Sequence, residues 1–201
     1  MKRLFDTVAS VTLMIAFAPA MLVIAVVVRA TSPGPAIYRA HRVGRDGVLF
    51  RMPKFRTMRI DTPQVATHLL SEPKRWMTPV GPILRRLSLD ELPQLFSVAR
   101  GEMSLVGPRP ALFNQEDLIA MRQAAGVSGL KPGVTGWAQI NGRDELSNEE
   151  KVRLDAEYGD RRSLLFDLWI LLRTALGCVF PSGVVEGAPA ETGTPSRSQA
   201  A

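Results

Sequence analysis

The stretch VASVTLMIAFAPAMLVIAVVV, residues Val8 to Val28, contains no charged side chain. At 1.5 Å of rise per residue, a helix of this length covers roughly 30 Å, about the thickness of the hydrocarbon core of a bilayer. We therefore predict a membrane segment. A secretory signal is less well supported, because the apolar run is longer than a typical signal core and the sequence that follows is basic and poor in cysteine.

Pro19 lies in the middle of this segment, where it removes one backbone hydrogen bond and favours a bend. A bent helix that enters and leaves on one side is one arrangement, and a kinked helix that spans the bilayer is the other. Basic residues flank both ends, so the positive-inside rule is satisfied only if both ends are cytoplasmic. The residues alone leave the two arrangements balanced. The flanking basic residues are Lys2, Arg3, Arg29, Arg39, Arg42 and Arg45.

The charge of the chain is concentrated near its start. Of 201 residues, 46% are hydrophobic, enough for one domain with an appendage. The formal net charge is +6, and the first sixty residues carry ten Lys and Arg against Asp6 and Asp46. Such a basic segment suits anionic lipid, phosphorylated substrates or nucleic acid. The single Cys178 excludes an internal disulfide and is expected to be a small buried hydrophobe.

The chain after the membrane segment predicts a mixed fold dominated by helices. Two short strands are expected around the turn Gly44 to Gly47, followed by an irregular region over residues 63–82 with one short helix. Helices are expected at 83–99, 112–125, 148–160 and 163–179. The last of these is nearly apolar, so it either lies in the membrane interface or packs in the core. The composition beyond residue 180 predicts a disordered tail.

Adjacent carboxylates, Asp90 and Glu91, stand at a predicted helix start. Either Ser88 or Asp90 can cap that helix, and capping at Asp90 places Pro93 in the first turn, where its missing N–H costs nothing. The helix dipole, with Arg85 and its neighbour Arg86, would favour ionised carboxylates. An ionised Asp can attack phosphorus and an adjacent Glu can hold Mg²⁺, although acidic residues in a first turn most often only cap.

Two loops add groups suited to a diphosphate. Residues 103–110 hold Arg109 between two prolines, which favours bidentate phosphate binding. Residues 131–143 offer Gly for close backbone approach, a Trp face, amides such as Gln139, and cations including Arg143. Each loop alone could be an ordinary turn, but together with the acidic pair they supply a coherent set of groups.

In these motifs the chain resembles the bacterial sugar transferase family, the monotopic phosphoglycosyl transferases that begin glycan assembly on polyprenol phosphate. The resemblance covers residues 1 to about 180, in the family order. The segments that carry it are Lys54-Phe55-Arg56-Thr57-Met58, Leu89-Asp90-Glu91-Leu92-Pro93-Gln94-Leu95, Met103 to Pro110, Lys131 to Arg143, and Leu154-Asp155 with Tyr158.

The resemblance implies an α+β, mostly helical fold with three parts: a re-entrant membrane helix hairpin at 1–30, a catalytic domain at 31–180 with a small β-hairpin at the membrane interface, and a tail at 181–201. The protein would lie on the cytoplasmic face of the bacterial inner membrane as a monotopic protein. Its partners would be a UDP-sugar, polyprenol (undecaprenyl) phosphate and membrane lipid, without nucleic acid. A homodimer is left open.

The resemblance also implies a ping-pong mechanism in which Asp90 attacks the β-phosphate, UMP leaves, and polyprenol phosphate displaces the phosphosugar. Glu91 would bind Mg²⁺, and Asp155, Gln139 and Arg143 would support the site. The residues implied in phosphate binding are Lys54, Arg56, Arg85 and Arg109.

Two positions depart from the family pattern. Ala18 precedes the helix-breaking proline where Ser is frequent, so a hydroxyl that could bond to the freed carbonyl is missing. Glu157 precedes Tyr158 where a second aromatic is frequent.

The sequence is also compatible with two rival functions. One is a membrane-tethered binding protein whose acidic pair only caps a helix; the other is a conventional glycosyl transferase releasing UDP, for which no D-x-D sequence is present.

Overall fold

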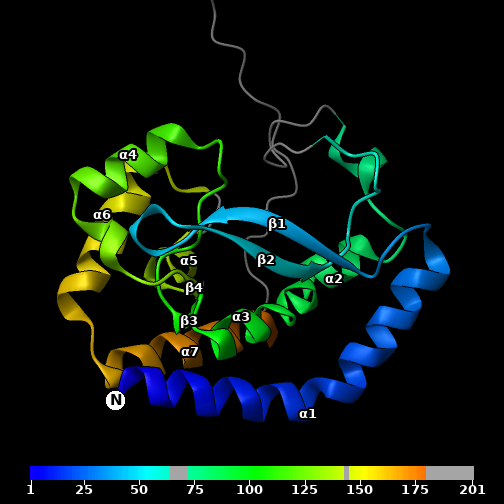
Figure 1. Ribbon diagram of the computed structural model, residues 1–201, viewed down its shortest axis with the longest axis horizontal. Helices are drawn as coiled ribbons and strands as arrows, with labels where there is room; N and C mark the ends of the chain where they lie inside the picture. The colour runs from blue at the N-terminus through cyan, green and yellow to red at the C-terminus, as the bar shows by residue number, and fades with distance from the viewer. Residues whose placement is uncertain (64–71, 143–144, 180–201) are drawn as a thin grey trace, which may run out of the picture.

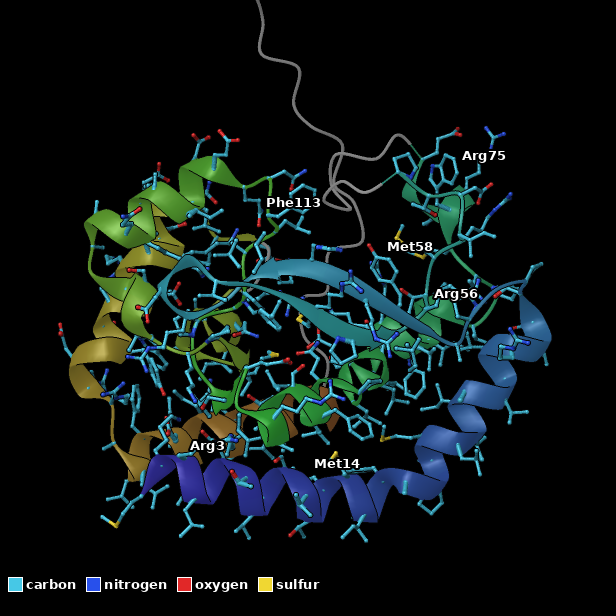
Figure 2. The ribbon with its side chains drawn as sticks, viewed as in Figure 1. Arg3, Met14, Arg56, Met58, Arg75 and Phe113 are labelled. Carbon is cyan, nitrogen blue, oxygen red and sulfur yellow. The ribbon has the colours of Figure 1, made fainter. Side chains whose placement is uncertain are left out.

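The computed structural model describes residues 1–63, 72–142 and 145–179, and its N-terminal helix α1 (Lys2–Thr31) forms one long edge of the molecule (Figure 1). The helix contains Pro19 and bends beyond Met14 (Figure 2). Along it, large apolar side chains such as Ile15 and Leu22 are exposed. Among the described residues, α1 is the helix that is long and apolar enough to cross a membrane. The predicted apolar helix and its bend are therefore present.

The predicted hairpin is confirmed. Strands β1 (Ile37–Val43) and β2 (Leu49–Phe55) pair antiparallel, with Ala40 opposite Met52 and Lys54 opposite Tyr38. Alternate side chains face opposite sides of such a pair, so Ala40 and Met52 enter the core while Lys54 shares their face. The short turn η1 (Arg45–Gly47) joins the strands, and Asp46 adopts a positive φ of 56° there.

Short helical elements make up most of the remainder. The helices expected at 148–160 and 163–179 are confirmed as α6 and α7, and the one expected at 112–125 starts later. The elements are η3 (Pro73–Trp76), α2 (Gly81–Arg86), η4 (Leu89–Glu91), α3 (Gln94–Arg100), α4 (Glu116–Ala124), η5 (Val127–Gly129), α5 (Trp137–Ile140), α6 (Asn148–Arg161) and α7 (Leu164–Val179). The tail predicted beyond residue 180 lies outside the described residues.

The continuous helix predicted over 83–99 is wrong. The chain forms α2, then the 3₁₀ turn η4, then α3. Ser88 has φ 55° in the left-handed region, which ends α2, and Pro93 stands directly before α3 because it has no N–H for an interior helical bond. Neither Ser88 nor Asp90 caps α3 with its side chain. The acidic pair therefore lies in a tight turn between two short helices.

A second, parallel pair of strands lies inside the two segments expected to be loops. Strand β3 (Ser104–Val106) pairs with β4 (Gly133–Thr135). The glycines there serve the fold: a Cβ on Gly107 would collide with the carbonyl of Lys131, and one on Gly136 would collide with the carbonyl of Gly107. The sequence predicted that glycines would let the backbone approach a substrate closely. In the structure Gly107 and Gly136 instead let the backbones of the two loops approach each other.

Both ends of α1 are held by the same folded part. At its start, Lys2 Nζ lies 2.5 Å from Asp167 Oδ2 of α7, and Arg3 donates to carbonyls at the end of α3. The buried Asp6 accepts hydrogen bonds from the hydroxyl and the backbone N–H at the start of β3. At its other end, Arg56 of the segment after β2 donates to carbonyls just past α1. The helix thus leaves the folded part and returns to it.

The core joins all of these elements. Its largest cluster lies between the hairpin, α3, β3, α6 and α7, and consists of Ala40, Met52, Leu95, Val98, Met103, Leu105, Val106, Tyr158 and Ile170. Helix α7 contributes one buried face to it, whereas Leu165, Leu168 and Leu172 of the same helix are exposed. The fold is mostly helical with two small sheets, as expected.

Candidate active site

The acidic pair in η4 is packed against a lysine from the hairpin. Asp90 is 6% exposed, and Lys54 Nζ lies 2.6 Å from Glu91 Oε1 and 3.9 Å from Asp90 Oδ2. Because residue 54 faces the core side of β2, its ammonium reaches the turn that carries both carboxylates. One cation therefore lies between two adjacent acids that are largely withdrawn from water.

Arg109 brings a second cation to Glu91 from the loop after β3. Its NH2 lies 3.1 Å from Glu91 Oε1, and its side chain is 40% exposed. Burial alone would raise the pKa of Glu91, but the charges and hydrogen bonds of Lys54 and Arg109 outweigh burial and hold that pKa well below its usual range. Glu91 is thus ionised throughout the physiological pH range.

The environment of Asp90 acts in the opposite direction. Burial raises its pKa, and Lys54 opposes this while the charge of Glu91 adds to it. The sequence predicted that a helix start would favour ionisation of both acids, but α3 begins only at Gln94. Lys54 is therefore the largest of the positive charges that oppose the effect of burial on Asp90, ahead of Arg85 and Arg109. Burial lowers the pKa of Lys54 in turn, against the pull of Glu91.

The structure brings some of the predicted phosphate-binding residues together and separates others. Lys54 and Arg109 meet at the acidic pair. Arg85 lies one turn before it, with Nε 3.2 Å from Thr57 Oγ1, and its charge lowers the pKa of Asp90. Arg56, by contrast, is 5% exposed and donates to the carbonyls of Pro35 and Ser32. These hydrogen bonds attach the end of α1 to the segment after β2 and do not involve the acidic pair.

The predicted supporting residues also divide. Gln139 donates to the carbonyl of Val134, within its own loop, and its buried Oε1 has no hydrogen-bond partner among the described residues. Arg143 lies outside the described residues. The hydrogen bond of Gln139 therefore goes to its own loop and not to the acidic pair Asp90 and Glu91.

Asp155 acts on the site through an arginine that the sequence reasoning missed. Arg122 of α4 donates from Nε and NH2 to Asp155 Oδ2, at 3.0 and 2.6 Å, and from NH1 to the carbonyl of Arg109 at 2.8 Å. Asp155 is 1% exposed, and burial raises its pKa against the charge of Arg122. The pair fixes the backbone of the residue that reaches Glu91. No local pattern marked Arg122, since an arginine late in a helix is common.

The acidic pair fits a magnesium ion. Asp90 and Glu91 supply hard carboxylate oxygens side by side, and Glu91 is ionised. Mg²⁺ commonly takes one or two carboxylates and leaves its other positions to water and substrate phosphate. No group of three or more acidic, His or Cys side chains suited to a metal occurs in the described part of the chain.

The sequence was compared with protein families and with individual known proteins. The sequence profile of the family described as bacterial sugar transferase matches residues 1–181. The chain is 41% identical to "Uncharacterized sugar transferase EpsL" of Bacillus subtilis, over 92% of this chain and 90% of that protein. It is 38% identical to "Exopolysaccharide production protein ExoY" of Rhizobium meliloti, over 86% of this chain and 83% of that protein.

A longer relative is named for a defined activity. The chain is 40% identical to the "UDP-glucose:undecaprenyl-phosphate glucose-1-phosphate transferase" of Escherichia coli, over 87% of this chain and 39% of that protein. The family profile over residues 1–181 includes the hairpin lysine, the acidic turn and the segments 103–110 and 131–143. The protein is therefore an enzyme that belongs to the bacterial sugar transferase family.

Proposed function

We propose that this enzyme transfers a sugar 1-phosphate from a UDP-sugar to polyprenol phosphate and releases UMP, as the first membrane step in the assembly of a glycan. Relatives at about 40% identity carry names for this class of reaction with glucose. The observation that carries the proposal is the buried Asp90 beside Glu91, with Lys54 and Arg109 directed at the pair.

In the first half-reaction, the Asp90 carboxylate attacks the β-phosphorus of the donor. A bond forms between Asp90 Oδ and phosphorus, and the bond from phosphorus to the bridging oxygen breaks, so that UMP leaves with the electron pair. Lys54 and Arg109 lie where they can neutralise phosphate oxygens as negative charge moves to the leaving group. Because Asp90 must be ionised to attack, the positive charge of Lys54 is part of the chemistry.

In the second half-reaction, an oxygen of polyprenol phosphate attacks the same phosphorus. The bond to Asp90 breaks, the carboxylate is regenerated, and the product is a polyprenol diphosphate sugar. The incoming phosphate takes the position that UMP has left, so Arg109 serves both halves. Glu91 would hold Mg²⁺, which supplies positive charge to the diphosphate of the donor.

The arrangement of α1 supports a re-entrant position in the membrane. The helix bends, and its two ends lie at opposite sides of the molecule (Figure 1). Lys2 at its start binds Asp167 of α7, and the carbonyl of Ser32 at its end accepts from Arg56, so both ends contact one folded part. We place both ends at the cytoplasmic face of the inner membrane. The exposed apolar faces of α1 and α7 would lie in lipid and its interface.

The test is the identity of the released nucleotide. Purified enzyme in nanodiscs with Mg²⁺ and undecaprenyl phosphate is incubated with UDP-glucose and a panel of other UDP-sugars, and the product is separated into UMP and UDP. We expect UMP, abolished in Asp90→Asn and retained in Asp160→Asn, an exposed control. Mass spectrometry of the enzyme with donor alone should show a phosphosugar on Asp90.

Other outcomes would replace the proposal with one of its rivals. Release of UDP would indicate a conventional glycosyl transferase. Full activity of Asp90→Asn would remove the nucleophile, and absence of release across the panel would favour a binding protein.

A further inference from the structure

We propose that the cavity beside the hairpin turn binds the nucleoside of the donor; this inference rests on the proposed function. The cavity, called here the turn pocket, has a volume of about 280 Å³. It lies between the turn that joins β1 and β2, the loop after β3, the end of α4, and η5. Its polar lining residues are Asp46, Arg109, Arg122, Gln123 and Ser128.

The turn pocket is joined to the acidic pair through Arg109. This residue lines the pocket, and its guanidinium also lies 3.1 Å from Glu91 Oε1. In the proposal the diphosphate lies at Arg109 and the acidic pair, with the nucleoside next to it in the pocket. None of Lys54, Asp90 and Glu91 lines the pocket, so the pocket is separate from the residues assigned to phosphoryl transfer.

One wall of the pocket is preorganised. Arg122 is held by two hydrogen bonds to Asp155 and one to the carbonyl of Arg109. A guanidinium has five N–H groups, and these bonds use three of them, so a wall of this kind can also donate to a carbonyl or phosphate oxygen. Little side-chain entropy would be lost on binding, because the buried carboxylate of Asp155 already fixes the arginine.

The remaining lining suits a pyrimidine base with its ribose. Apolar walls come from Val43, Ile119, Val127 and Leu130, between which a flat ring can pack. Gln123 carries both a donor and an acceptor, as the amide edge of a pyrimidine does, and the Asp46 carboxylate can accept from a ribose diol. The volume of about 280 Å³ lies just below the usual range of ligand sites, about 300 to 1,000 Å³, and so fits one nucleoside better than a whole nucleotide sugar.

The geometry of displacement favours the nucleoside over the sugar. The leaving group must depart on the side of phosphorus opposite Asp90, whereas the sugar stays on the enzyme until the lipid arrives. The hairpin turn lies on the side of α4 and α6, while α1 runs along another edge of the molecule (Figure 1). UMP bound here leaves to water, and the phosphate of the acceptor, whose lipid chain comes from the apolar surface of α1, then takes its place on the same side of phosphorus.

The experiment places a large side chain in the pocket and another beside it. Gln123 lines the pocket and is exposed, so Gln123→Phe is designed to cover the pocket with a ring; Ala124→Phe is the matched control, since Ala124 is exposed on the same helix but does not line the cavity. UMP binding is measured by calorimetry with full-length enzyme in nanodiscs. We expect Gln123→Phe to weaken UMP binding at least about tenfold, which is about 1.4 kcal/mol, and Ala124→Phe to leave it within about twofold.

Kinetics give a second readout that general damage would not imitate. The KM for the UDP-sugar should rise in Gln123→Phe, whereas transfer from preformed phosphosugar enzyme to polyprenol phosphate should keep its wild-type rate. Ser128→Leu, which also narrows the pocket, provides a second variant should Gln123→Phe unfold.

The pocket proposal is overturned if wild-type enzyme does not bind UMP, or if Gln123→Phe and Ser128→Leu bind it as tightly as wild type. Equal losses in Ala124→Phe would also overturn it. Because the binding assay needs no turnover, a wild type that binds UMP at this pocket but releases UDP in the reaction would sink the proposed function and leave the pocket standing.

Discussion

Replacing Lys54 by Met removes the cation that lies between the two acids and keeps a side chain of similar length. In the wild type its Nζ is 2.6 Å from Glu91 Oε1 and 3.9 Å from Asp90 Oδ2. At 3.9 Å and an effective dielectric constant of about 20, such a pair interacts by about 4 kcal/mol. We expect the pKa of Asp90 to rise further in the variant, because the largest positive charge that opposes the effect of burial is removed.

The assay is the initial rate of UMP release between about pH 5 and about pH 9. The rate falls on the acid side as Asp90 becomes protonated, so this limb should move to higher pH in Lys54→Met. At neutral pH the loss of charge stabilisation should lower kcat by about 10²- to 10³-fold. Lys74→Met, an exposed lysine in η3, is the control and should match wild type.

Stability should change with pH in a defined direction. In wild type the depressed pKa of Glu91 contributes stability above the unfolded value of about 4.3, and this contribution is lost as pH falls through the folded pKa. Without Lys54 a buried acid is left with one fewer cation, at a cost of about 3 kcal/mol at neutral pH. That cost should shrink as the two acids become protonated. The free energies of unfolding of wild type and Lys54→Met should therefore converge toward low pH. An unchanged acid limb together with a low kcat would refute the reasoning, because Lys54 would then act only on the substrate.

Three further substitutions test other parts of the structure. Asp155→Asn leaves Arg122 charged and buried without its partner, so urea unfolding should show a loss of about 3–5 kcal/mol; wild-type stability would contradict the support assigned to this pair. Arg56→Met removes charged hydrogen bonds to carbonyls past α1, so Tm should fall while the KM for the donor stays within about twofold of wild type. A large rise in KM would instead indicate that Arg56 binds phosphate. Gly107→Ala drives a Cβ into the carbonyl of Lys131 and should lower the free energy of unfolding by about 1–3 kcal/mol in thermal unfolding. Gly177→Ala, whose Cβ meets nothing and whose φ is not positive, is the control and should not destabilise the protein.

Local pattern was sufficient for the elements whose residues repeat at a fixed period. The uncharged run from Val8 to Val28 predicted α1, and the alternation around the turn Gly44 to Gly47 predicted the hairpin. The apolar period of residues 163–179 predicted α7, and adjacency placed Asp90 and Glu91 in one turn. Each of these conclusions depends on neighbours within a few residues, so a sequence holds all the information they require.

Only the tertiary structure decided which groups act on the acidic pair. Lys54 and Glu91 are 37 positions apart and meet because β2 packs on η4. Arg56, two residues beyond Lys54, is buried against the end of α1 and serves a different contact. The charge of Asp90 depends on burial, which no short motif reports.

The sequence by itself thus determined a long apolar helix, a basic hairpin, an acidic turn and the family to which these motifs belong. The tertiary structure decided the break between α2 and α3, the pairing of β3 with β4 through Gly107, and the link from Asp155 through Arg122 to Arg109. The physical reason is that periodicity reflects the geometry of one element, whereas the field at a buried carboxylate depends on side chains from distant segments that packing brings within a few ångströms.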